Sequence, residues 1–141
     1  MCKAIELGKV VVDVCLDREI MLNTSKLQKL LFYMQKTSLK QNEQICFEEN
    51  IIALECGPAI DAIRQYFCSY NIGFTLNDKQ NAQLVLLDDE KAILEDVLIL
   101  YGKMSPMELI ELSRQEPSWI KTWCDGEGKG NTVSTNDIRY M

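Results

Sequence analysis

The chain has 141 residues, of which 47% are hydrophobic and 26% charged, so it is long enough to bury one core without metals or disulfide bonds. Its formal net charge of −6 and pI near 4.7 disfavour non-specific binding to nucleic acid or to an anionic membrane surface. No run of about 18 apolar residues is present, so no membrane-spanning helix is expected.

Histidine is absent from the sequence, which excludes Ser-His-Asp and Cys-His catalysis and histidine-ligated metal sites. The six cysteines are scattered without a Cys-x-x-Cys pair, so zinc-ribbon and thioredoxin-like sites are not expected. Most of these cysteines have apolar neighbours, and the first eight residues lack the pattern of a signal peptide. We therefore expect a reduced, cytoplasmic protein.

The first predicted element is an amphipathic helix over residues 2–16, where apolar side chains recur at near-helical spacing. The β-branched run at residues 10–12 would also suit a strand.

The second predicted element is a helix over about residues 24–40, and the rest of the chain is expected to be organised around it. A polar N-cap residue precedes it, with Asn23, Thr24 and Ser25 as candidates. At about 100° per residue, one apolar stripe is formed by Leu27, Leu30, Leu31 and Met34. The adjacent face is predicted to be cationic and to carry Lys26, Lys29, Tyr33, Lys36 and Lys40.

A short antiparallel β element is predicted around residues 45–56, after a polar turn at 41–44. The apolar runs there are short, are broken by Glu48-Glu49-Asn50 and end at Gly57-Pro58. Two short strands, or one strand and an extended segment, fit this pattern.

Pro58 is expected in the first turn of a helix that runs to about residue 70 and ends at residues 71–73. The inward-facing residues of this helix are predicted to be Ile60, Ile63, Tyr66 and Phe67. Residues 74–87 are a second candidate β segment, in which 83–87 would pair with 74–76 as a hairpin.

Acidic residues 88–90 begin the next predicted helix, where the macrodipole favours negative charge. It extends to residue 101, ends at Gly102, and its core face is predicted to carry Ile93, Leu94, Val97, Leu98 and Tyr101.

Ser105-Pro106-Met107-Glu108 is a capping box, which predicts a helix to about residue 115. A further helical turn or two starts at Pro117, and a final short helix covers residues 134–141. Residues 125–131 between them are predicted to be a mobile loop. The fold class is therefore mainly α (α+β): a compact single-domain bundle of about six helices over residues 1–141, with a short antiparallel β element.

Candidate catalytic features are weak. The glycines of residues 126–130 lack the preceding strand and the following helix of a phosphate-binding loop. The carboxylates at 48–49 and 88–90 are adjacent and point in different directions, which does not suit acid–base catalysis or a metal site. We predict no catalytic residue, no metal and no cofactor, and we expect that the chain is not an enzyme.

Three segments carry a family resemblance: residues 25–33 (Ser-Lys-Leu-Gln-Lys-Leu-Leu-Phe-Tyr), 52–59 (Ile-Ala-Leu-Glu-Cys-Gly-Pro-Ala) and 112–119 (Leu-Ser-Arg-Gln-Glu-Pro-Ser-Trp). In this order and spacing they resemble the Panacea domain of phage-associated GepA-type proteins and SocA-like antitoxins, over about residues 4–140. The first segment matches the family pattern throughout. The second departs from it at three positions, and in the third Arg114 replaces a frequent histidine.

The resemblance implies a mostly helical domain with a short sheet that acts as an antitoxin and binds a toxin directly. Some relatives look like adaptors that hand a toxin to an ATP-dependent protease, and members are often encoded in prophages. The resemblance thus implies a protein partner, namely a toxin and in some cases a protease.

We predict that the partner binds beside the cationic face and the Gly57-Pro58 turn, where glycine allows close backbone approach and proline stiffens the turn. Two alternatives stay open: a ligand-binding or enzymatic domain that uses the face of Lys26 and Tyr33, and a phage modulator of a host factor. The same residues would also stand out in the sequence if their only role were to stabilise the fold. The predicted partner-binding residues are Lys26, Lys29, Tyr33, Lys36, Gly57, Pro58, Glu116 and Trp119.

Overall fold

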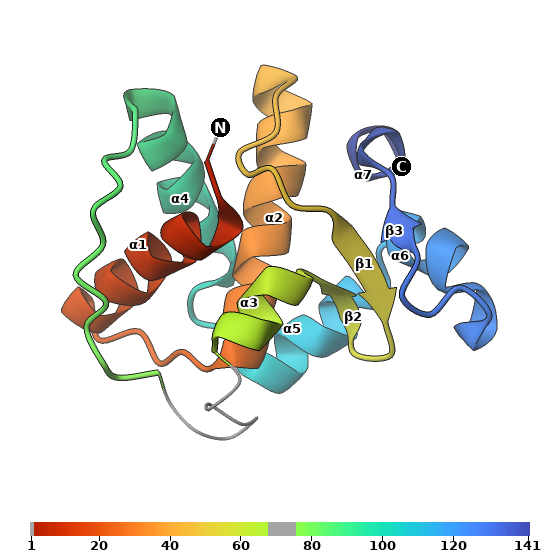
Figure 1. The fold of residues 1–141 in the computed structure, drawn as a ribbon, viewed down its shortest axis with the longest axis horizontal. Coiled ribbons are helices and arrows are strands. Elements are labelled where there is room, and N and C mark those ends of the chain that lie inside the picture. Colours follow the sequence, from red (N-terminus) through yellow and green to blue (C-terminus); the bar gives the residue numbers. More distant parts are fainter. Residues whose placement is uncertain (1, 68–75) are drawn as a thin grey trace.

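The computed structural model describes residues 2–67 and 76–141, in which seven α-helices and one small antiparallel sheet are present (Figure 1). The mainly α (α+β) class is confirmed. In chain order the elements are α1 (Ala4–Asp17), α2 (Thr24–Asn42), β1 (Ile51–Leu54), β2 (Gly57–Ala59), α3 (Asp61–Tyr66), α4 (Asp88–Tyr101), α5 (Pro106–Ser113), α6 (Pro117–Trp123), the 3₁₀ turn η1 (Cys124–Gly126), β3 (Thr132–Val133) and α7 (Thr135–Tyr140).

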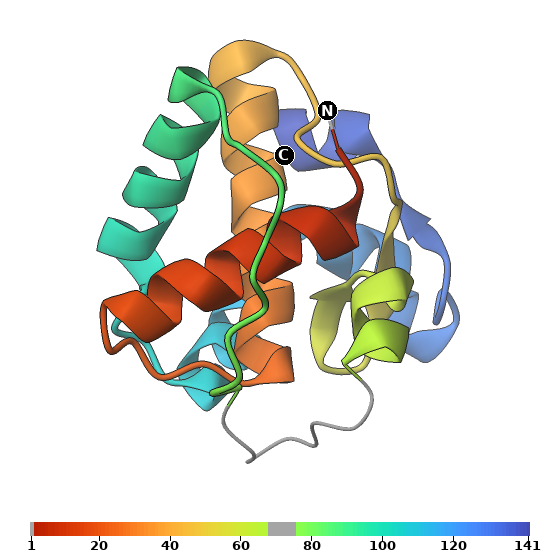
Figure 2. The same cartoon turned by 60° about the vertical axis from the view of Figure 1, so that its left-hand side comes forward.

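Helix α2 stands at the centre, with α1, α4, α5 and the sheet arranged around it (Figures 1 and 2). The Asn23 side chain caps it by accepting a hydrogen bond from the Lys26 backbone N–H at 2.8 Å. Every residue from 25 to 35 is buried. The apolar stripe and the part of the predicted cationic face within these residues therefore both pack against other parts of the protein. Burial of each leucine of the apolar stripe contributes on the order of 2 kcal/mol.

The sheet has the strand order β2-β1-β3, and both pairs are antiparallel. The predicted β element is therefore present, but its paired strands lie at residues 51–59 and a third strand joins from the C-terminal part. Pro58 lies opposite Ala53 in β2, so its predicted place in a first helical turn is wrong. The reason is that β2 is an edge strand, where a residue without an N–H is tolerated.

Helix α3 is short, and it begins three residues after Pro58. Its neighbours Ile60 and Phe67 are buried together with Ile63, as predicted. Tyr66 is 46% exposed, so the inward orientation predicted for it is wrong. Its ring lies 5.2 Å from the Lys9 ammonium group, on the surface beside α1. The predicted helix end at residues 70–73 lies outside the described residues.

The predicted strand at residues 83–87 is not formed, and the structure has no strand within residues 76–87. Of its expected hairpin partner, residues 74 and 75 lie outside the described residues. The segment runs extended across α1 (Figure 2). Asp13 of α1 holds it, because its carboxylate accepts hydrogen bonds from the backbone N–H groups of Gln80 and Ala82 at 2.6 and 2.9 Å. A helix side chain thus takes the place of a strand partner.

The second half of the chain follows the sequence patterns closely. The capping box is confirmed, with the Glu108 N–H donating to Ser105 Oγ at 3.1 Å and the Ser105 N–H donating to Glu108 Oε1 at 3.0 Å. The predicted core residues of α4 are buried, except that Tyr101 is half-buried. No helix within residues 2–67 and 76–141 combines the length and apolar character needed to span a bilayer.

Residues 125–131, expected to be a mobile loop, instead form a turn that is joined to β1. The Gly130 N–H donates to the Ala53 carbonyl at 2.7 Å, and the Ala53 N–H donates to the Asn131 carbonyl at 2.9 Å. These bonds guide the chain into β3, which the sequence pattern did not indicate because its partner lies about 80 residues earlier.

Candidate functional site

Gly57 and Pro58, the first two residues of β2, pack directly against α2. Lys29 Nζ donates a hydrogen bond to the Pro58 carbonyl at 2.9 Å. Gly57 has φ of +110°, and a Cβ atom there would lie 2.5 Å from Ser113 Oγ and 3.3 Å from Lys29 Nζ. Only a residue without a side chain lets β2 approach both α2 and α5 this closely.

Lys26 and Lys29 are 2% and 1% exposed, so the prediction that they form an open cationic face is wrong. Lys26 Nζ donates to the Gly102 carbonyl at 2.7 Å, which ties α2 to the end of α4. Burial lowers the pKa of Lys29 to about 8, and burial also lowers the pKa of Lys26. These ammonium groups are turned inward because each satisfies a backbone carbonyl that would otherwise be buried without a donor.

Glu116, the N-cap residue of α6, accepts hydrogen bonds from two residues of α2. Lys36 Nζ donates to Oε1 at 2.5 Å, and the Tyr33 hydroxyl donates to Oε2 at 3.3 Å. Burial, and next the Glu116 charge, raise the pKa of Tyr33, so the phenol remains a proton donor at neutral pH. The Tyr33 ring is stacked on Tyr101 of α4 with ring centroids 4.1 Å apart.

Trp119 fixes α6 to the sheet. Its Nε1–H donates to the Leu54 carbonyl at 2.9 Å, and the residue is 3% exposed. Its ring is stacked on Trp123 with centroids 5.4 Å apart, and the Arg114 guanidinium lies 5.3 Å from the ring centroid. The exposed Arg114 thus covers an otherwise buried tryptophan.

The structure therefore links seven of the eight predicted residues through contacts at the junction of α2, β2 and α6, whereas Lys26, one turn before Lys29, is bonded to the end of α4. Of the eight, Lys36 and Glu116 keep part of their side chains at the surface, 23% and 13% respectively. The described residues bring together no group of three side chains that could hold a metal ion.

Sequence reasoning missed two glutamines of α2. Gln28 is bonded to Ile60 twice, accepting from its N–H at 2.7 Å and donating to its carbonyl at 3.0 Å. Gln35 accepts from the Cys46 N–H at 2.7 Å and donates to the Phe47 carbonyl at 3.1 Å. Their spacing of seven residues places them on one side of the helix, which was the available signal. The polar residues of α2 thus hold the backbone of surrounding segments.

These features define a helical domain in which a central, hydrogen-bonding helix holds a small sheet and a C-terminal helix pair. A family model described as antitoxin SocA-like, Panacea domain, matches residues 27–120, and the chain belongs to this family. The match runs from α2 into α6 and so includes nearly all of the site. Membership supports a role of the toxin–antitoxin type and a protein partner such as a toxin. Searches of curated proteins and of solved structures gave no significant match.

Proposed function

We propose that this chain is an antitoxin that binds its cognate toxin directly and neutralises it without catalysis. The observation that carries the proposal is the family match over residues 27–120. The buried polar groups of α2 are engaged in holding the fold, which supports a role without catalysis. The net charge of −6 favours a basic partner, because complementary charge speeds association.

The partner-binding role of the eight residues remains a prediction, and we divide it between two kinds of residue. Lys36 and Glu116 are the proposed direct contacts, because both are partly exposed at the N-terminus of α6. The six buried residues are proposed positioning residues: Lys26 holds the end of α4, and the other five hold β2 and α6 in place. The enzymatic or small-ligand alternative needed an accessible face with Lys26 and Tyr33, and both are about 2% exposed.

The test is co-expression with the neighbouring genes. A neighbour that stops growth alone and is harmless beside this chain is the toxin, and tagged toxin should retain this chain on a column. Lys36→Met should weaken that binding by about tenfold, the usual effect of losing a moderate contact. Lys40→Met is the matched control, since Lys40 lies on the same helix and its ammonium group donates to the Arg139 carbonyl. If no neighbour is rescued by wild-type chain, the proposal is wrong.

Delivery of the toxin to an ATP-dependent protease is the second proposed form of the same role. In a host without the protease, rescue by simple occlusion persists, whereas rescue by delivery is lost and the toxin accumulates.

The proposed compartment is the cytoplasm, which is supported by the free thiols of the five cysteines in the described residues. Prophage coding is proposed from the resemblance, and the gene neighbourhood tests it. A host protein recovered in place of a toxin would instead favour a phage modulator of a host factor.

A further inference from the structure

Residues 83–87 form an extended segment whose backbone is free as far as Leu86, whereas the Leu87 N–H donates to Glu90 Oε1 and its carbonyl accepts from the Lys91 N–H. Within the part of the chain that the structure describes, no N–H or carbonyl of residues 83–86 has a hydrogen-bond partner. The side chains alternate in exposure, with Val85 at 80%, Leu86 at 8% and Leu87 at 67%. This alternation is that of a β-strand. The segment therefore presents a row of unpaired backbone groups and exposed apolar side chains, as an open sheet edge does.

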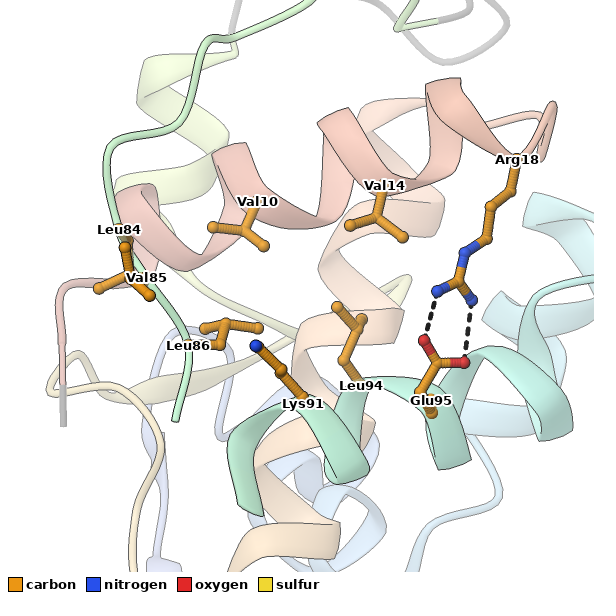
Figure 3. A pocket seen from close by; sticks show the side chains of 9 residues that line it. All are labelled: Val10, Val14, Arg18, Leu84, Val85, Leu86, Lys91, Leu94 and Glu95. Carbon is orange, nitrogen blue, oxygen red and sulfur yellow. Dashed lines mark hydrogen bonds and ion pairs between the residues drawn. The ribbon is translucent and has the colours of Figure 1, made fainter. Parts of the chain in front are cut away.

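A groove of about 400 Å³ lies beside this segment, between α1 and α4 (Figure 3). Its apolar lining comes from all three elements, namely Val10, Val14, Leu84, Val85, Leu86 and Leu94. The Arg18–Glu95 ion pair borders one end, and Lys91 lies beside Leu86 toward the other. A chain added along residues 83–87 would thus have a groove for its apolar side chains next to donors and acceptors for its backbone.

The edges of the small sheet are less suited to such pairing. The edge strand β2 contains Pro58, which has no N–H to donate, and β3 has two residues. Strand addition to residues 83–87 meets neither obstacle.

The charges around the segment indicate the kind of occupant. Asp88 and Asp89 are exposed directly after Leu87, and the whole chain carries −6. A basic partner would be attracted to this end, whereas a second copy would bring a further −6. Lys91 forms no ion pair with any described residue, which leaves it available for one acidic side chain of the occupant.

We propose that an extended, alternately apolar segment of a basic partner protein adds as a β-strand along residues 83–87 and places its apolar side chains in the adjoining groove. The proposal rests on the proposed function, because the partner is the toxin that this chain neutralises. It adds a docking surface on the α1–α4 side of the molecule, separate from the α2–β2–α6 junction.

The experiment compares wild type, Val85→Asp and Ile99→Asp for binding to the toxin identified by growth rescue. Ile99 is the matched control, because it is 75% exposed on α4 and does not line the groove. Both positions are exposed, so equal thermal midpoints are expected for all three proteins. Val85→Asp should weaken binding by about tenfold or more, while Ile99→Asp should bind as wild type does. Amide hydrogen exchange of residues 83–86 should slow on complex formation.

Toxin binding that is equal in all three proteins, with unchanged exchange at residues 83–86, would overturn the strand addition and leave the antitoxin role standing. Failure of wild type to bind or rescue any neighbouring toxin would overturn both. A homodimer of wild type that Val85→Asp dissociates would also overturn the proposal, since the segment would then be an interface between copies of this chain.

Discussion

The ammonium group of Lys29 donates a hydrogen bond to the Pro58 carbonyl at 2.9 Å, across 29 residues of sequence, and only 1% of the lysine is exposed. This bond joins the first two signature segments of the family. A buried ammonium group loses its hydration, and one carbonyl compensates that loss only in part. The lysine is therefore charged at neutral pH at a cost in stability.

The first prediction follows from the pKa of Lys29, which burial lowers to about 8 from 10.5. Between these two pH values the unfolded chain binds more protons than the folded chain, so the free energy of unfolding contributed by Lys29 rises with pH. The rise approaches about 1.4 kcal/mol per pH unit. Burial raises the pKa of Cys15 to about 11 and of Cys46 to about 12, and these thiols act in the opposite direction above pH 9.

Comparison with Lys29→Met removes the contribution of the thiols, because both proteins contain them. The free energy of unfolding of wild type, relative to that of the variant, should increase by about 1 kcal/mol per pH unit from pH 8 to pH 10. Urea unfolding at a series of pH values measures this difference in free energy of unfolding. Two stability profiles that stay parallel over this range would show that Lys29 does not titrate in the folded protein.

The second prediction concerns the close approach at Gly57. Gly57→Ala adds a Cβ atom 2.5 Å from Ser113 Oγ to a backbone with φ of +110°. Gly130→Ala is the matched control, because its φ is +83° and nothing lies within 4 Å of its Cβ position. Left-handed strain of about 1–2 kcal/mol is expected in both, and overpacking should add about 1–3 kcal/mol at Gly57 alone. Equal urea midpoints of the two variants would contradict this view of the β2–α5 contact.

The third prediction isolates the paired hydrogen bonds of Gln28. Gln28→Met keeps the approximate shape of the side chain and leaves the Ile60 N–H without a partner, while the Ile60 carbonyl still accepts from the Arg64 N–H at 3.2 Å. One unsatisfied buried N–H group should lower the free energy of unfolding by about 1–3 kcal/mol. Gln65→Met serves as the control on an exposed face, where a change within about 0.5 kcal/mol is expected. A variant of Gln28 as stable as the control would mean that water satisfies Ile60.

The fourth prediction concerns the charge of Glu116. Glu116→Gln retains a hydrogen-bond acceptor but removes the carboxylate that faces Tyr33 and Lys36. The pKa of Tyr33 should fall and still lie above its ordinary value, because burial is the larger cause of its rise. Tyrosinate absorbance in an alkaline titration measures the change.

Stability provides a second measure of the same variant. Loss of the partly buried ion pair should cost about 1–3 kcal/mol, whereas Glu95→Gln, which breaks the exposed pair with Arg18, should cost clearly less because solvent screens that pair. The opposite order of the two costs would indicate that Glu116 is better hydrated than its position at the N-terminus of α6 suggests.

The sequence by itself determined the features that depend on near neighbours in the chain. A polar cap within residues 23–25, the Ser105–Glu108 capping box and the apolar stripe of α2 could be predicted, because helix ends and helix faces are set by residues three or four positions apart. The structure decided that Asn23 is the capping residue. The three signature segments likewise identified the family that the match confirmed.

Only the tertiary structure decided which way the polar side chains of α2 face. Lysines on one face of a helix have the same spacing in the sequence whether they are exposed to water or bonded to a buried carbonyl. Lys29 is buried because Pro58, from another element, packs beside it and accepts its hydrogen bond. The same holds for Pro58, whose strand exists because Ala53 lies opposite, and for β3, which finds its partner far upstream. Such outcomes depend on contacts between distant segments, and local periodicity carries no information about them.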